Sequence, residues 1–180
     1  MDLWVFGYGS LLWDPGFAPA ERQAALLEGW HRSFCMLSIH HRGTSAEPGL
    51  VLALDAAPGA LCRGAALRVA AGQEAVVLAM LRARELVSSA YLERELPVTL
   101  ADGRQVAAVT YVIDPGHGQY CRLDPETQAQ MIARAAGGRG PNRDYLFATA
   151  AHLADAGMAD PDLDRLAERV RQLTPGAGPP

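Results

Sequence analysis

The chain has 180 residues, 49% of them hydrophobic and 20% charged, which suits one sizeable globular core. A net charge of −4 argues against a nucleic-acid partner. All sixteen cations are Arg, which excludes Schiff-base chemistry, pyridoxal phosphate anchoring and a Walker-type phosphate loop, because each needs a Lys.

The cysteines and the start of the chain indicate the compartment. Cys35, Cys62 and Cys121 are odd in number, widely spaced and free of any CxxC, so neither a disulfide framework nor a thiolate zinc site is expected. The first residues lack the basic region and long apolar run of a signal peptide, and no stretch reaches the roughly 18 apolar residues of a membrane helix. We therefore expect a reduced, cytoplasmic protein with no membrane partner.

Strand and turn signals fill the first two thirds of the chain. An apolar strand at residues 4–6 leads into a glycine-flanked tyrosine. Further strands are predicted at residues 50–54 and 62–70, with a turn at Ala57-Pro58-Gly59 between them.

The hydrophobic pattern then changes from that of strands to that of a helix. Residues 72–91, where it changes, are rich in the helix formers Ala, Leu, Met, Arg and Glu. A hairpin follows, with strands at residues 96–100 and 106–113 joined by Asp102-Gly103. Between helix and hairpin, Glu93-Arg94-Glu95 is most simply interpreted as a solvated charged turn.

The last third is predicted to be helical. Asp124-Pro125 and Asp160-Pro161 each place a capping carboxylate before a proline at the first helical position. Asn142 is a candidate cap for a helix that runs to Ala156. We expect one α+β domain over residues 1–173, with a curved mixed sheet or small barrel, surrounding helices and a flexible tail at residues 174–180.

The glycine-flanked tyrosine is the most informative local feature. Gly7 and Gly9 allow a turn that can aim successive N–H groups into one hollow, which suits carboxylates and oxyanions. A dinucleotide loop is disfavoured, because Leu12 stands where the third glycine of GxGxxG would be. A purely structural turn remains the alternative.

Glu85 is the candidate acid–base group. Leu78, Leu81, Glu85 and Ser88 have the spacing of one helical face, so the carboxyl would sit on an apolar stripe. Desolvation there would raise its pKa and make it a useful base near neutral pH. The alternative is a carboxylate at the helix edge that pairs with Arg82.

Seven features in a fixed order resemble the ChaC-type γ-glutamylcyclotransferases, from Trp4 to about Leu173. The resemblance implies a γ-glutamylcyclotransferase-like fold. The matching features are residues 5–11, Arg42-Gly43-Thr44 with Pro48-Gly49, the Leu-x-x-Arg-Glu pattern at residues 81–85, Tyr91, the Asp102-Gly103 hairpin, Asp114-Pro115 and Asn142-x-x-Tyr145-Leu146.

The same resemblance implies site residues. Glu85 would be the catalytic base, and Tyr145 would help to line the substrate site, although a partly buried core tyrosine is an equal alternative. Arg42 could pair with the substrate's glycyl carboxylate or be solvated, and Ser38 is a fainter candidate. The γ-glutamyl-binding loop would comprise Val5, Phe6, Gly7, Tyr8, Gly9, Ser10 and Leu11.

The implied reaction cleaves glutathione to 5-oxoproline and Cys-Gly without a cofactor. No metal is expected, because His40 and His41 are adjacent and no HExxH is present. The alternatives are a cyclotransferase for another γ-glutamyl amine or peptide, a non-catalytic γ-glutamyl-binding protein, and a structural or assembly protein. The oligomeric state does not follow from the sequence.

Overall fold

The computed structural model describes residues 2–176, so residues 177–180 of the predicted tail lie outside the described part. The chain divides into two compact units. A barrel unit contains residues up to 33 and residues 53–118, and a helical unit contains residues 34–52 and those from 119 onward. Each unit is described by itself.

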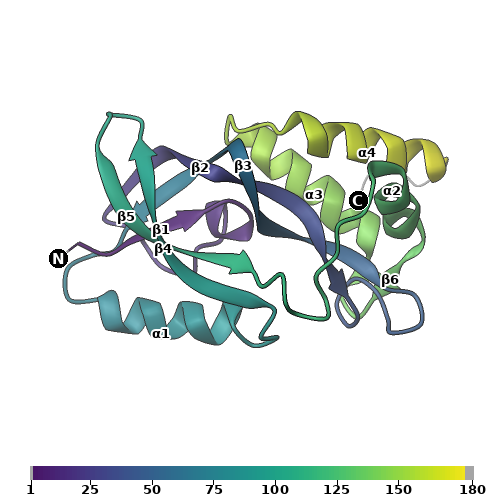
Figure 1. The fold of residues 1–180 in the computed structure, drawn as a ribbon, viewed down its shortest axis with the longest axis horizontal. Helices are drawn as coiled ribbons and strands as arrows, with labels where there is room; N and C mark the ends of the chain where they lie inside the picture. Colours follow the sequence, from purple (N-terminus) through teal and green to yellow (C-terminus); the bar gives the residue numbers. More distant parts are fainter. Residues whose placement is uncertain (1, 177–180) are drawn as a thin grey trace. The chain divides into compact units, whose positions relative to one another are not determined.

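Five strands form a closed barrel in the order β1-β3-β2-β4-β5 (Figure 1). A parallel pairing of β1 with β5, Trp4 opposite Ala108 and Val5 opposite Val109, closes the barrel, whereas β4 and β5 pair antiparallel as the predicted hairpin. The α+β class with a small barrel is thereby confirmed. The strands are β1 (Trp4–Gly7), β2 (Glu21–Ser38), β3 (Gly49–Arg68), β4 (Tyr91–Leu100) and β5 (Gln105–Ile113).

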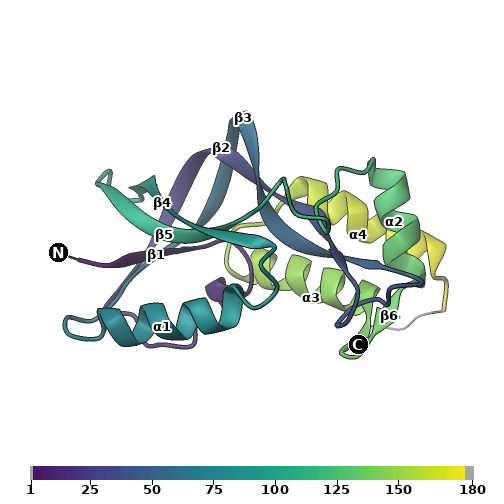
Figure 2. The same ribbon diagram turned by 60° about the horizontal axis from the view of Figure 1, so that its bottom comes forward.

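Helix α1 (Glu74–Glu85) runs alongside β1, β4 and β5 in both views (Figures 1 and 2). Its buried face, Val77 and Leu81, packs in one apolar cluster with Val5 of β1 and with Val109 and Tyr111 of β5. This packing fixes the end of α1, where Glu85 lies, against the barrel.

Three local predictions for this unit are wrong. The expected turn at residues 57–59 lies inside β3, where Gly59 has φ +83°, a conformation that glycine supplies within irregular strands. The helix ends at Glu85 rather than at residue 91, so Ser88 is not on its face. The charged segment 93–95 belongs to β4 and pairs with β5.

The helical unit contains α2 (Pro125–Arg134), α3 (Asn142–Asp155) and α4 (Pro161–Leu173), which contact one another (Figure 1). The short strands β6 (Ala136–Gly137) and β7 (Gly140–Pro141) join α2 to α3. As predicted, the carboxylates of Asp124 and Asp160 accept backbone N–H groups at the starts of α2 and α4.

Asn142 does not cap α3, contrary to the prediction. Its side chain is buried and bonds the main chain of Leu50 twice, accepting from the N–H and donating to the carbonyl, both at 2.8 Å. The amide thus pairs with a β3 residue as a neighbouring strand would. Its partner lies 92 positions away, which explains why a local capping rule missed it.

No helix among residues 2–176 has the length and apolar character that a transmembrane span requires.

Candidate active site

The glycine loop, residues 7–11, leaves β1 and enters a short 3-10 turn, η1 (Ser10–Leu12). Val5 and Phe6 are fully buried and their main chains pair with β3, so neither presents accessible surface to a ligand. Ser10 is exposed. The N–H groups that open a helical turn have no partner within it, so the loop presents main-chain donors beside the Ser10 hydroxyl.

Tyr8 is an anchor of this loop. The residue is 8% exposed, and its hydroxyl donates to the carbonyl of Tyr111 on β5 at 2.8 Å. Gly64 allows β3 to approach the loop closely. A Cβ at this position would lie only 2.4 Å from the carbonyl oxygen of Gly7. The loop is therefore fastened to β5 and closely approached by β3.

A buried arginine, Arg32 of β2, holds the same loop from another side. Its Nε donates to the carbonyl of Tyr8 at 3.0 Å, and its Nη2 donates to the carbonyl of Arg63. Arg32 is 7% exposed, and because a guanidinium is costly to bury, these main-chain acceptors offset the cost by satisfying part of its hydrogen-bonding capacity. Arg32 therefore helps to fix the path of the loop.

Arg84 links the glycine loop to α1. Its Nη2 donates to the Ser10 hydroxyl at 2.9 Å, and its Nη1 donates to the carbonyl of Asp14 at 2.7 Å. Its Nε lies 3.2 Å from Oε1 of Glu85. One guanidinium therefore joins the loop hydroxyl to the candidate base.

Burial has the largest effect on the pKa of Glu85. Its side chain is 18% exposed. Desolvation raises the pKa of this carboxyl above the ordinary glutamate value, while the positive charge of Arg84 opposes the shift. In place of the alternative pairing with Arg82, which bonds Glu93, the cation beside Glu85 is Arg84.

A second carboxylate, Glu93 of β4, has stronger partners. Arg82 donates to it from Nε and Nη2 at 2.9 and 2.8 Å, and the Tyr111 hydroxyl donates at 3.1 Å. These bonds lower the pKa of Glu93. Burial and the charge of Glu93 raise the pKa of Tyr111, and the charge of Glu85 adds to that rise.

Arg42, Ser38 and Tyr145 lie together in the helical unit. Arg42 donates from Nη1 to the carbonyls of Arg139 and Pro141 at 2.9 and 3.2 Å, and its guanidinium lies 5.6 Å from the Tyr145 ring centroid. The Tyr145 hydroxyl accepts the N–H of Leu52 at 3.1 Å, and the Ser38 hydroxyl accepts the N–H of Arg42. These contacts position the segments around β6 and β7.

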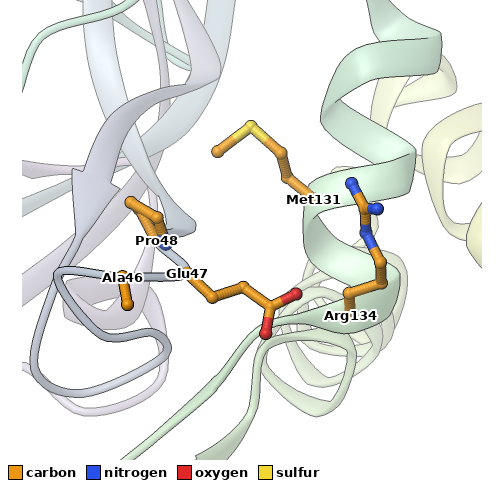
Figure 3. Close-up of a pocket in the computed structure, with 5 residues that line it drawn as sticks. All are labelled: Ala46, Glu47, Pro48, Met131 and Arg134. Carbon is orange, nitrogen blue, oxygen red and sulfur yellow. The ribbon is translucent and has the colours of Figure 1, made fainter.

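A groove of about 520 Å³ also lies in the helical unit. Figure 3 shows Met131 and Arg134 of α2 on one side, with Ala46, Glu47 and Pro48 on the other. None of the site residues predicted from the sequence lines it. We therefore build the candidate active site on Glu85 and the glycine loop, which lie in the barrel unit.

Sequence reasoning passed over Arg32, Arg84, Glu93 and Tyr111. Arg32 carried a usable signal, because it alternates along β2 with Phe34 and Met36, which are buried. Glu93 was missed because its segment, which belongs to β4, was interpreted as a turn. Within residues 2–176, no three His, Cys, Asp or Glu side chains cluster in a way that could hold a metal ion.

Comparison with known proteins places this geometry in a family. The profile described as ChaC-like protein matches residues 3–173. A glutathione-specific gamma-glutamylcyclotransferase of Escherichia coli (strain K12) is 37% identical over 175 residues, covering 95% of this chain and 74% of that protein. Gamma-glutamylcyclotransferase 2-3 of Arabidopsis thaliana is 32% identical, covering 96% of this chain and 90% of that protein.

The fold has a close counterpart among solved structures. The crystal structure of a selenomethionine-labelled gamma-glutamyl cyclotransferase specific to glutathione from yeast matches with a TM-score of 0.82. The two chains share 22% identity, and the match covers 95% of this chain and 96% of the yeast chain. At that identity the likeness concerns the fold, whereas the profile and the sequence relatives establish membership: the chain belongs to the ChaC-like protein family.

Proposed function

We propose that this protein is an enzyme, a lyase that cleaves the γ-glutamyl bond of glutathione by intramolecular cyclisation. Its family membership and its relatives named as glutathione-specific gamma-glutamylcyclotransferases support this reaction. The family match over residues 3–173 supports one functional domain. Glutathione is a cytosolic metabolite, so the cytoplasm suits this activity.

The substrate supplies its own nucleophile. Its α-amine attacks the γ-carbonyl carbon, the five-membered ring of 5-oxoproline closes, and the bond to the cysteinyl nitrogen breaks to release Cys-Gly. The α-ammonium loses one proton before it attacks and a second as its nitrogen becomes the lactam N–H, while the leaving nitrogen gains two and departs as the ammonium of Cys-Gly. A single group that accepts a proton from the first nitrogen and donates it to the second, acting twice, balances the reaction without a cofactor.

We assign that proton transfer to Glu85. The observation that carries the assignment is a carboxyl with a pKa raised by burial, joined through Arg84 to the Ser10 hydroxyl of the glycine loop. A carboxylate with a higher pKa is a stronger base. Its protonated form also persists closer to neutral pH, where it can donate the proton to the leaving nitrogen. Glu93 is a weaker candidate, because three hydrogen bonds already occupy its carboxylate.

The glycine loop would hold the γ-glutamyl group folded for ring closure. Main-chain N–H groups from Gly7 to Leu11 suit a carboxylate or the developing oxyanion, and one such donor is typically worth ~3 kcal/mol of barrier. The anchoring of Tyr8 to Tyr111 and Arg32 supports a loop that is preorganised for this task. For Arg42 and Tyr145, contact with the glycyl end of the substrate remains our prediction.

The reaction and its base are tested in one experiment. Purified protein is incubated with glutathione, and 5-oxoproline and Cys-Gly are followed by mass spectrometry. Glu85→Gln is run alongside, with Glu95→Gln as a control that removes an equal charge from an exposed position on β4. We expect both products from the wild type and from Glu95→Gln, and almost none from folded Glu85→Gln.

Two outcomes would contradict parts of the proposal. Wild-type turnover by Glu85→Gln would remove Glu85 from the mechanism. Folded wild type that leaves glutathione intact would exclude glutathione as the substrate, and a panel of other γ-glutamyl amines and peptides would then be tested. Binding without turnover across that panel would establish a non-catalytic binding protein.

A further inference from the structure

Two cysteines far apart in the sequence lie on adjacent antiparallel segments of the helical unit. Cys35 lies near the end of β2, and the segment 119–121 runs antiparallel beside it. The N–H of Cys121 donates to the carbonyl of Cys35 at 2.9 Å, and the N–H of Leu37 donates to that of Gln119 at 2.7 Å. With Met36 opposite Tyr120, this ladder makes Cys35 and Cys121 direct cross-strand partners.

Direct partners in an antiparallel pair project their side chains from the same face. At a hydrogen-bonded position the Cα atoms are about 5.5 Å apart, within the 4.4–6.8 Å range that disulfides span. The Cβ atoms of such pairs are roughly 4.5–5.5 Å apart, whereas a disulfide needs about 3.5–4.5 Å. A shift of about 1 Å would bring the two sulfur atoms into bonding geometry.

We propose that Cys35 and Cys121 are a redox-active pair that forms a reversible intramolecular disulfide. The oxidant is a low-molecular-weight disulfide. One protein thiolate attacks a sulfur of the oxidant and releases the first small thiol, and the second cysteine attacks the mixed disulfide and releases the other. The pair loses two electrons and two protons, and the oxidant gains them as two thiols.

The order of attack follows from exposure. Cys121 is partly exposed and meets the oxidant first, whereas Cys35 is 1% exposed and resolves the mixed disulfide from within. Burial raises the pKa of the Cys121 thiol, so little thiolate is present at neutral pH and the first attack is slow. The closure needed between the Cβ atoms strains the bond, which makes it easier to reduce than a structural disulfide.

The test counts thiols in the intact, folded protein. The protein is treated with 2-hydroxyethyl disulfide, freed of reagent, unfolded and labelled with N-ethylmaleimide. We expect label uptake to fall from three thiols to one, with a Cys35–Cys121 peptide found by mass spectrometry and all three labels restored by dithiothreitol. The probe contains no γ-glutamyl group, so the result is independent of the proposed catalytic reaction.

Matched variants separate this pair from general oxidation. Cys62→Ser removes the buried cysteine of the barrel unit and should still form the crosslink, leaving no thiol to label. Cys121→Ser should not form it; because this residue is partly exposed, its replacement threatens folding less than Cys35→Ser, and circular dichroism checks both. Uptake of three labels, a stable mixed disulfide on Cys121 without a crosslink, or a disulfide to Cys62 would each overturn the proposal.

Discussion

Two carboxylates of the barrel unit, Glu85 at the end of α1 and Glu93 on β4, have opposite electrostatic surroundings. Their side chains are similarly exposed, 18% for Glu85 and 25% for Glu93. Yet the pKa of Glu85 is raised, chiefly by desolvation, and that of Glu93 is lowered, chiefly by its bonds to Arg82. Desolvation raises the pKa of both carboxyls, but only at Glu93 do hydrogen bonds outweigh it.

The difference lies in hydrogen-bond partners. Glu93 accepts a two-point bond from Arg82 and a third bond from the Tyr111 hydroxyl, which stabilise its charged form. The cation beside Glu85 is Arg84, which also donates to Ser10 and to the carbonyl of Asp14. When the pKa values of two titratable groups are shifted in opposite directions in this way, the group with the raised pKa is the better candidate for acid–base catalysis.

The largest expected effect comes from replacing each carboxylate in turn. Glu85→Gln should lower kcat by roughly 10²–10⁴-fold, the usual contribution of a general acid–base group, and Glu93→Gln should stay within about tenfold of wild type. Steady-state kinetics with glutathione, after circular dichroism has shown both variants to be folded, measures the two. An equal loss in both variants would erase the distinction between the carboxylates.

A smaller effect is expected when the cation beside Glu85 is removed. Because Arg84 lowers the pKa of Glu85, Arg84→Met should raise that pKa further and move the acid limb of the kcat/KM profile to higher pH. Loss of the charged bonds to the loop should also cost about tenfold in kcat/KM. Arg84→Lys keeps the charge, so its acid limb should lie close to that of the wild type. If the acid limb does not move in Arg84→Met, Arg84 only positions the loop.

The smallest effect concerns stability. Since the pKa of Glu85 is raised in the folded state, the folded protein binds more protons than the unfolded chain between about pH 4.3, the ordinary glutamate pKa, and the raised value. Unfolding free energy therefore falls as the pH rises through this window and stays reduced above it. Glu85→Gln should melt at a higher temperature than wild type at neutral pH, by about 2–4 °C for each kcal/mol recovered.

That stability difference should vanish below about pH 4, where the carboxyl is protonated in both states. Thermal unfolding followed by circular dichroism across the pH range measures it. Glu95→Gln, at an exposed position, serves as the control and should show no such trend. A Glu85→Gln variant less stable than wild type at neutral pH would contradict the desolvated state of Glu85.

Sequence reasoning succeeded where a signal was local. The capping by Asp124 and Asp160 and the hairpin at Asp102-Gly103 depend on backbone preferences within a few residues, and the structure confirms each one. It failed where distant contacts overrode a local rule. Asn142 follows the capping pattern, yet its buried amide bonds Leu50, 92 positions away.

The candidate site divides in the same way. The sequence by itself determined a turn after β1, a glutamate on a helix and the family to which the chain belongs, because these depend on residue identity and order. Only the tertiary structure decided that Arg84 reaches Ser10 across 74 positions and that Arg82 takes Glu93 rather than Glu85 as its partner. Closing the barrel and packing α1 against β1 and β5 bring these side chains together, and no local pattern encodes contacts made by chain segments so far apart.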